Sequence, residues 1–276
     1  MLRAAVIQMV STAEVRENLD QAEQLLAEAA ADGARLAVLP ENFAFMGMHE
    51  ADKLPISETD GNGPIQSFLN ETAQKHKLWI IAGTIPLAGN NPDHARAASL
   101  LYDDEGRRVA RYDKIHLFDV EVDGGERYCE SDSLEAGDDV VVAQTPFTNI
   151  GLSVCYDARF PELYRNMLAR NVGLITVPSA FTAKTGEAHW ESLLRARAVE
   201  NLSYVIAANQ GGTHVNGRKT WGHSMIIDPW GHIVAQVDSG PGYACADLDF
   251  EQLGQLRQRF PALSHRRLNY ARADQT

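Results

Sequence analysis

The chain has 276 residues, of which 45% are hydrophobic, 37 are acidic and 25 are basic, so its formal net charge is -12. The negative charge disfavours nonspecific binding to nucleic acid or to an anionic membrane. Three scattered cysteines form no disulfide framework, and no apolar run reaches the ~20 residues of a membrane span. We therefore expect a cytoplasmic protein that acts on small molecules, without nucleic-acid or membrane partners.

The first half of the chain alternates strands and helices. Apolar patterns predict strands over residues 2–9, 36–39 and 78–85, and helices over residues 15–31 and 65–76. This βαβαβ order predicts a sheet covered by helices. A hairpin is then predicted from residues 99–102 and 109–112, which flank a turn with the sequence DDEG. The acidic, aperiodic stretch 119–139 is predicted to be an ordered loop.

The second half repeats this order. After strands at 140–143 and 150–155, it has predicted helices at 161–170 and 189–201 and predicted strands at 174–177 and 204–208. The sequence LITVPSAF from Leu174 parallels LAVLPENF from Leu36, and the hairpin SMIIDPWGHIVAQVD from Ser224 parallels SLLYDDEGRRVARYD from Ser99. We infer an internal pseudo-two-fold repeat of βαβαβ-hairpin units.

Two such one-sided sheets would pack together as a four-layer α-β-β-α sandwich, an α/β fold. No linker composition separates the halves, so we predict a single domain over residues 1–276. Its core is expected at about residues 3–260, and residues 261–276 are expected to be a tail after a last helix that starts at Phe250.

Cys155 lies between an alternating apolar strand and a predicted helix start at Pro161. Free backbone N–H groups at such a turn would lower the pKa of the thiol and could hold an oxyanion. This position suits a nucleophile, but a buried structural cysteine fits the segment equally well.

Two charged residues also follow predicted strands directly. Glu41 comes after a strand and a proline, and Lys114 comes after the hairpin. If the repeat brings these strand ends together, Glu41, Lys114 and Cys155 would supply a base, a cation and a thiol. Taken singly, each charged residue could equally be a surface solubiliser.

Four segments resemble the successive motifs of the nitrilase superfamily of carbon–nitrogen hydrolases, from about Arg3 to Phe260. They are LPENF with Glu41, RYDKIHLFDVE with Lys114, CESDSLEAGD with Glu130 and GLSVCYDARFPEL with Cys155. The resemblance implies an α-β-β-α sandwich in which Cys155 attacks an amide carbonyl and Glu41 is the general base. It also implies that Lys114 and the Tyr156 N–H stabilise the oxyanion and that Glu130 holds the lysine.

Within that superfamily, PSAFTAKTGEAHWESLLRARAVE from Pro178 and GHSMIIDPWG from Gly222 resemble the branch that hydrolyses deaminated glutathione. The implied reaction converts a small carboxylated 2-oxo acid amide to the acid and ammonia through a cysteinyl thioester. Omega-amidases acting on 2-oxoglutaramate resemble the chain too. A nitrilase, an N-carbamoyl hydrolase and a catalytically silent interaction protein on the same fold remain alternatives.

The candidates for binding the substrate lie close to these motifs in sequence. They are Tyr156, Arg159, Phe45, Phe181, Thr182, His189 and Trp190. Arg159 could bind a substrate carboxylate, or it could cap a helix or pair with Asp157 or Glu162. His189 and Trp190 could equally belong to the core.

No cofactor or metal is expected. His214, His223 and His232 recur every nine residues, which suits no common zinc spacing. Cys129 could be a redox partner of Cys155 or an incidental loop thiol. By resemblance to the family, we expect a homodimer or higher homo-oligomer paired through the helices at 161–170 and 189–201 and the C-terminal tail.

Overall fold

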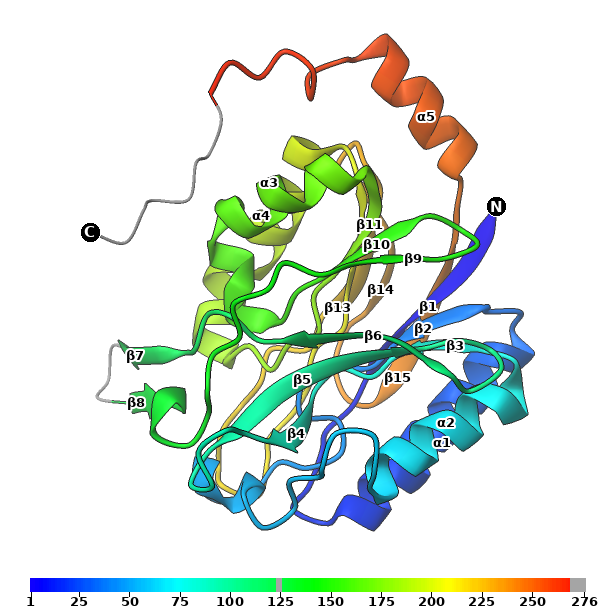
Figure 1. Ribbon diagram of the computed structural model, residues 1–276. Coiled ribbons are helices and arrows are strands. Elements are labelled where there is room, and N and C mark those ends of the chain that lie inside the picture. The colour runs from blue at the N-terminus through cyan, green and yellow to red at the C-terminus, as the bar shows by residue number, and fades with distance from the viewer. Residues whose placement is uncertain (123–125, 269–276) are drawn as a thin grey trace.

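The computed structural model describes residues 1–122 and 126–268. Two large sheets pack face to face, with one pair of helices outside each sheet (Figure 1). The predicted four-layer α-β-β-α sandwich is therefore confirmed. Within the described ranges, no helix is both long enough and apolar enough to cross a bilayer.

The first sheet has the strand order β15-β1-β2-β3-β5-β4, and β6 pairs with β5. Strands β1, β2 and β3 are parallel, and the other pairs are antiparallel. Helices α1 and α2 cover its outer face (Figure 1). The elements are β1 (Leu2–Gln8), α1 (Val15–Ala31), β2 (Leu36–Val38), α2 (Pro64–His76), β3 (Trp79–Ile81), β4 (Ile85–Ala88), β5 (Ala95–Tyr102), β6 (Arg108–Asp113) and β15 (Gly242–Leu248).

The second sheet has the order β14-β13-β12-β11-β10-β9, again with three parallel strands, β10, β11 and β12. Helices α3 and α4 lie on its outer face, and α5 projects beyond the sandwich (Figure 1). The elements are β9 (Val142–Gln144), β10 (Asn149–Leu152), α3 (Pro161–Met167), β11 (Val172–Thr176), α4 (Ala183–Asn201), β12 (Tyr204–Ala207), β13 (Ser224–Ile227), β14 (Ile233–Val237) and α5 (Phe250–Arg259).

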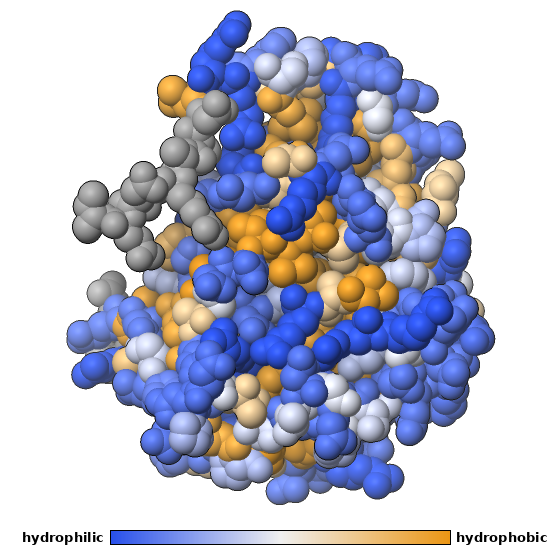
Figure 2. All heavy atoms as spheres, viewed as in Figure 1, coloured by the Kyte–Doolittle hydropathy of each residue, from blue (hydrophilic) through white to orange (hydrophobic). Residues whose placement is uncertain are grey.

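Strand β1 shows why these strands are apolar throughout. Ala4 and Val6 belong to the core cluster between the two sheets, whereas Ala5 and Ile7 belong to the cluster under α1 and α2. Successive side chains of a strand point to opposite faces, so a strand covered on both faces needs a continuous apolar run. The face shown in Figure 2 is mainly hydrophilic, and apolar atoms are visible near its middle.

The two halves have matching topologies, as the internal repeat predicts. Each half is followed by a strand that joins the sheet of the other half. Strand β9 comes after the first half in the chain and pairs with β10 of the second sheet. Strand β15 comes after the second half and pairs with β1 of the first sheet. The hairpin turns match as well. Asp103 Oδ1 accepts from the N–H groups of Glu105 and Arg107, and Asp228 Oδ1 accepts from those of Trp230 and His232.

Some predicted boundaries were wrong. The stretch 119–139 is not only a loop, because β7 (Asp119–Val122) and β8 (Glu126–Cys129) form a two-stranded sheet in it. Helix α4 starts six residues before the predicted position, since Thr182 Oγ1 accepts from the N–H of Thr185 and caps the helix there. The predicted strand 78–85 is divided between β3 and β4, and β15 was not predicted at all.

Candidate active site

Glu41 lies in the turn after β2, and contacts from two other segments of the chain fix the backbone of that turn. The N–H of Asn42, which has a left-handed φ of 58°, donates to Thr84 Oγ1 at 2.9 Å. Gln210 Nε2, from the other half of the chain, donates to the carbonyl oxygen of Glu41 at 3.0 Å. A Cβ atom at Gly83 would lie 1.9 Å from the carbonyl oxygen of the residue before Glu41, so this close approach requires glycine.

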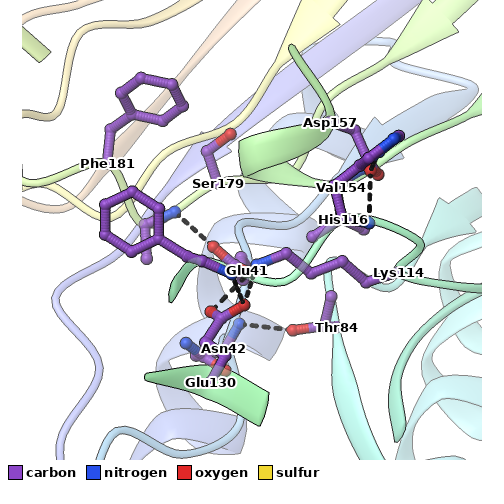
Figure 3. Close-up of polar contacts among 12 residues, drawn as sticks. Glu41, Asn42, Thr84, Lys114, His116, Glu130, Val154, Asp157, Ser179 and Phe181 are labelled. Carbon is purple, nitrogen blue, oxygen red and sulfur yellow. Dashed lines mark hydrogen bonds and ion pairs between the residues drawn. The ribbon is translucent and has the colours of Figure 1, made fainter. Parts of the chain in front are cut away.

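The Glu41 side chain forms a buried charged cluster with Lys114 and Glu130 (Figure 3). Lys114 Nζ lies 2.9 Å from Glu41 Oε1 and 2.7 and 3.0 Å from the two carboxylate oxygens of Glu130. The second oxygen of Glu41 accepts from the Ala180 N–H at 2.9 Å, and Glu130 Oε2 accepts from the Phe118 N–H at 2.9 Å. The side chains of Glu41 and Lys114 are only 4% and 1% exposed, so the pair is held largely away from water.

Cys155 begins a 3-10 turn (Cys155–Arg159) between β10 and α3. Its φ of 47° is in the left-handed region, which costs a non-glycine residue roughly 1–3 kcal/mol. Its N–H donates to the carbonyl oxygen of Pro178 at 2.8 Å, which anchors this backbone to the end of β11. The thiol and the carboxylate of Glu41 line the same cavity, and the charge of Glu41 acts on the thiol. The structure therefore brings together the three segments that carry Glu41, Lys114 and Cys155.

The prediction of a lowered thiol pKa is wrong. Burial and the negative charge of Glu41 raise the pKa of Cys155, and they outweigh Lys114 and the Ala180 N–H, which act in the opposite direction. Burial also opposes ionisation of Glu41, but the charge and the hydrogen bond of Lys114 keep the pKa of Glu41 below its usual value. Burial likewise opposes the Lys114 ammonium, yet Glu130 and Glu41 raise the pKa of Lys114. At neutral pH the cluster therefore holds a neutral thiol beside an ionised carboxylate.

Asp157 connects the lysine segment to the cysteine turn. Its fully buried carboxylate accepts from Tyr112 Oη at 2.6 Å, from the N–H of His116 at 3.1 Å and from the N–H of Val154 at 2.8 Å. His116 Nδ1 lies 2.6 Å from the same carboxylate. Because Tyr112 and His116 flank Lys114 in sequence, Asp157 sets the position of the lysine relative to Cys155. From the sequence, Asp157 was considered only as a partner of Arg159. No sequence pattern indicates that Asp157 contacts Tyr112 and His116, which lie 45 and 41 positions away in the chain.

A narrow cavity lies in front of Cys155, and most of the predicted site residues line it. Its lining comprises Glu41, Asn42, Phe118, Glu130, Cys155, Tyr156, Arg159, Ala180, Phe181, Thr182, Thr185 and Arg218. The guanidinium of Arg159 lies over the rings of Tyr156 and Phe181, at 5.8 and 5.4 Å from their centroids. Within the described ranges Arg159 forms no ion pair with Asp157 or Glu162; its Nη1 lies 3.3 Å from His189 Nδ1. Arg159 therefore offers a cation to an anionic ligand.

Three predicted binding residues do not line this cavity. Trp190 is 1% exposed, packs against Phe181 and donates to the carbonyl oxygen of His223 at 2.8 Å, which is a core position. Phe45 is buried, and His189 is exposed and reaches the site only through Arg159.

Arg218 was missed from the sequence, because a basic residue in a polar turn has no distinguishing pattern. Its Nη2 donates to the carbonyl oxygen of Ala180 at 2.7 Å, and its guanidinium lines the cavity. In residues 1–122 and 126–268, no three His, Cys, Asp or Glu side chains are grouped so that they could hold a metal ion.

An α-β-β-α sandwich with a thiol, a carboxylate and an ammonium at the ends of its strands is the architecture of a thiol hydrolase of the nitrilase superfamily. The profile of the Carbon-nitrogen hydrolase family matches residues 3–258, and the chain belongs to this family. It is a hydrolase that acts on carbon–nitrogen bonds other than peptide bonds.

Known relatives support this assignment over nearly the whole chain. A deaminated glutathione amidase of Synechocystis is 45% identical over 95% of this chain and 97% of its own length. The structure of the Caenorhabditis elegans NitFhit protein has a TM-score of 0.87 and 37% identity, covering 96% of this chain and 65% of that longer chain. A mutant amidase of Nesterenkonia sp. AN1, in which acrylamide has added to the active-site cysteine, has a TM-score of 0.78 and 26% identity, covering 95% and 98% of the two chains.

Proposed function

We propose that this protein is an amidase that hydrolyses the amide of a small carboxylated 2-oxo acid, with deaminated glutathione as its substrate. The observation that carries the proposal is that the Cys155 thiol and the buried carboxylate of Glu41 line one cavity, and that this carboxylate is paired with Lys114. This arrangement places a base near a nucleophile that must lose a proton in order to react. The 45% identity to an amidase named for this substrate supports the choice of substrate.

In the proposed mechanism, Glu41 takes the thiol proton while the sulfur of Cys155 bonds to the amide carbonyl carbon. The resulting oxyanion accepts hydrogen bonds from Lys114 Nζ and from the N–H of Tyr156. Lys114 Nζ contacts both carboxylate oxygens of Glu130. One N–H group of Lys114 can therefore turn toward the oxyanion while the ion pair between Lys114 and Glu130 persists. Protonated Glu41 then gives its proton to the leaving nitrogen, and a thioester forms. A water molecule deprotonated by Glu41 attacks the thioester carbonyl carbon, the carbon–sulfur bond breaks, and the acid is released. Glu41 returns the proton to the Cys155 sulfur.

The expected release of ammonia needs correction for this substrate. Glutathione is a γ-glutamyl-cysteinyl-glycine tripeptide, and loss of its amino group leaves two amide nitrogens, each bonded to carbon on both sides. Hydrolysis of the amide bond between the 2-oxo acid and the cysteine nitrogen therefore releases cysteinylglycine, with a free amino group, instead of ammonia. Ammonia would be released only from a primary amide such as 2-oxoglutaramate.

Arg159 is the proposed partner of the carboxylate of the 2-oxo acid. It lines the cavity beside Cys155 and lies over two aromatic rings, which restrict the guanidinium to one orientation. An arginine can bind a carboxylate through two parallel hydrogen bonds. Phe181 and Thr182 complete the same wall of the cavity.

A substrate panel tests the proposed function. Purified protein is assayed by mass spectrometry with deaminated glutathione, 2-oxoglutaramate, an aliphatic amide, a nitrile and an N-carbamoyl amino acid. We expect kcat/KM to be highest for deaminated glutathione, with release of 2-oxoglutarate and cysteinylglycine. A higher kcat/KM for 2-oxoglutaramate would instead identify an omega-amidase, and turnover of only the nitrile or the carbamoyl compound would contradict the proposal.

The pKa directions predict the pH dependence of the reaction. A carboxylate whose pKa is lowered is ionised above that pKa, so the active form of Glu41 is lost only at pH values below the ordinary glutamate pKa of about 4.3. The thiol stays protonated through the neutral range because its pKa is raised. We therefore expect kcat/KM to be flat between about pH 6 and 8. A tenfold rise per pH unit in that interval would indicate instead that a free thiolate is the reactive form.

Glu41 also links pH to stability. Because its pKa is lower in the folded state, it stabilises the fold above its unfolded-state pKa, and this contribution is lost as the pH falls through the folded-state pKa.

We also propose that residues 1–276 form one cytoplasmic domain that assembles as a homodimer or higher homo-oligomer. Strands β9 and β15 each pair with the sheet of the other half, which supports a single domain.

Three exposed apolar side chains support an interface between subunits. They lie on α4, on the turn between β13 and β14 and after α5, and they are Val199, Trp230 and Phe260, which are 48%, 54% and 49% exposed. Light scattering at micromolar concentration should then give at least twice the monomer mass of 30.4 kDa.

A further inference from the structure

A second, larger cavity adjoins the narrow one in front of Cys155. It has a volume of about 480 Å³, and the two cavities share the side chains of Asn42 and Arg218. Its walls come from the segment between β2 and α2, from β8 and from the loop around Asn216. We call it the outer cavity. Its volume lies within the range of pockets that bind small molecules, roughly 300–1,000 Å³.

Among the charged side chains that line the outer cavity, cations predominate. It contains Lys53, Arg127 and Arg218, against a single carboxylate, that of Glu50. Lys53 Nζ lies 2.6 Å from Glu50 Oε2, and this cation lowers the pKa of Glu50 to about 2. Glu50 is therefore ionised and balances one of the three cations. An excess of positive charge remains in a protein whose net charge is -12.

Arg218 is held where the two cavities meet. Its guanidinium lies 5.1 Å from the centroid of the Tyr128 ring, and its Nη2 donates to the carbonyl oxygen of Ala180. Its Nε is buried and has no hydrogen-bond partner among the residues that the structure describes. A buried donor without a partner costs roughly 1–3 kcal/mol, so a bound acceptor at this position would be favourable.

The arrangement of the cavities assigns them to different halves of a substrate. Arg159 lines the narrow cavity but not the outer one, whereas Lys53 and Arg127 line only the outer one. If an acyl group occupies the narrow cavity with its carboxylate at Arg159, the substituent on the amide nitrogen continues past Asn42 and Arg218. That substituent then enters a space in which Lys53, Arg127 and Arg218 face a single carboxylate.

We propose that the outer cavity binds the amine half of an N-substituted amide and pairs the terminal carboxylate of that half with Arg127, Arg218 and Lys53. The proposal rests on the proposed function and extends it to the leaving group. It makes the preferred substrate an amide with a carboxylate at both ends, whose amine is an amino acid or a short peptide. A primary amide fills only the narrow cavity and forgoes these contacts.

Two matched ligands test the proposal. One is cysteinylglycine acylated on its amino nitrogen by the C5 carboxyl group of 2-oxoglutarate, with a free terminal carboxylate, and the other is the same compound with a terminal carboxamide. Their Kd values are measured by calorimetry on the full-length Cys155→Ala protein, which binds the ligands without turnover. The same measurements follow with Arg127→Gln or Arg218→Gln added. Arg16→Gln is the matched control, because this side chain is 87% exposed on α1 and the substitution removes the same charge.

We expect the Cys155→Ala protein to bind the carboxylate ligand about tenfold more tightly than the carboxamide, as for a charge-assisted contact. Arg127→Gln and Arg218→Gln should reduce this preference to about threefold or less, and Arg16→Gln should leave it at about tenfold. Equal affinity for the two ligands, or a preference that neither cavity variant changes, would overturn the proposal.

Turnover by the wild-type protein separates this proposal from the proposed function. If the wild-type protein hydrolyses neither ligand although the Cys155→Ala protein prefers the carboxylate form, the proposed function fails and the outer cavity remains an anion site. If hydrolysis occurs without any preference for the carboxylate, the proposed function stands and the assignment of the outer cavity fails.

Discussion

Replacing Cys155 with alanine should lower kcat for amide hydrolysis on the order of 10⁴-fold or more, because it removes the atom that forms the thioester. The fold should persist, since the thiol is small and the N–H that anchors the turn to Pro178 remains. The measurement is kcat on 2-oxo acid amides, together with a thermal melt that shows a folded protein.

Cys129→Ala and Cys245→Ala are the matched controls for this substitution, because these two thiols are only partly buried and do not line the cavity. Both variants should keep kcat within about twofold of wild type, as expected for substitutions away from the site. Mass spectrometry of a quenched wild-type reaction should find the acyl group on Cys155. Full turnover by the Cys155→Ala protein, or an acyl adduct on another cysteine, would rule out the proposed mechanism.

Replacing Lys114 with methionine should lower kcat by about 10²- to 10³-fold, the usual loss when one oxyanion donor is removed. It should also lower the free energy of unfolding by about 3–5 kcal/mol, because it leaves the buried carboxylates of Glu41 and Glu130 without their shared cation. The two effects are measured separately, by steady-state kinetics and by denaturant unfolding.

A double variant distinguishes catalysis by Lys114 from its effect on stability. Adding Glu130→Gln to Lys114→Met removes one of the two unpaired negative charges, so part of the stability should return. The value of kcat should stay low, because the oxyanion donor is still missing. If kcat returned together with stability, the lysine would only hold the fold together.

The charge distribution of the site explains why both substitutions have large effects. Glu41 accepts from Lys114 and from the Ala180 N–H, so its carboxylate is ionised and oriented before a substrate binds. The proposed proton transfer moves a proton between two groups that line the same cavity. Lys114 faces the negative charge at every step, on Glu41 before the transfer and on the oxyanion after it.

Local signals in the sequence were sufficient for most of the secondary structure, and they indicated which charged side chains and which thiol could form a site. The catalytic roles of these residues stay a prediction. The continuous apolar run of β1 and the periodicity of α1 depend on which side chains are buried, and burial leaves a pattern in the chain. The matched hairpins indicated the internal repeat, and the repeat implied that strand ends carrying Glu41, Lys114 and Cys155 could meet. The motifs around these residues then identified the family.

Other features depended on contacts between distant segments, which leave no periodic trace in the chain. Strand β15 was not predicted because its partner is β1, at the opposite end of the sequence. Trp190 was a binding candidate by its place in a motif, but packing against Phe181 places it in the core. Arg218 reaches the cavity only because the loop that carries it folds back over Ala180.

The protonation state of the site was also decided by the tertiary structure. A strand-to-helix turn predicts a thiol of lowered pKa, yet the pKa of Cys155 is raised because packing buries it and places the charge of Glu41 beside it. Sequence specifies which groups can ionise, whereas the balance of burial and neighbouring charge exists only after the two sheets have packed. The order of most helices and strands along the chain and the residues expected to react could thus be predicted from the sequence, while the order of strands in each sheet, the depth of the site, its charges and its second cavity came from the packing of the two halves.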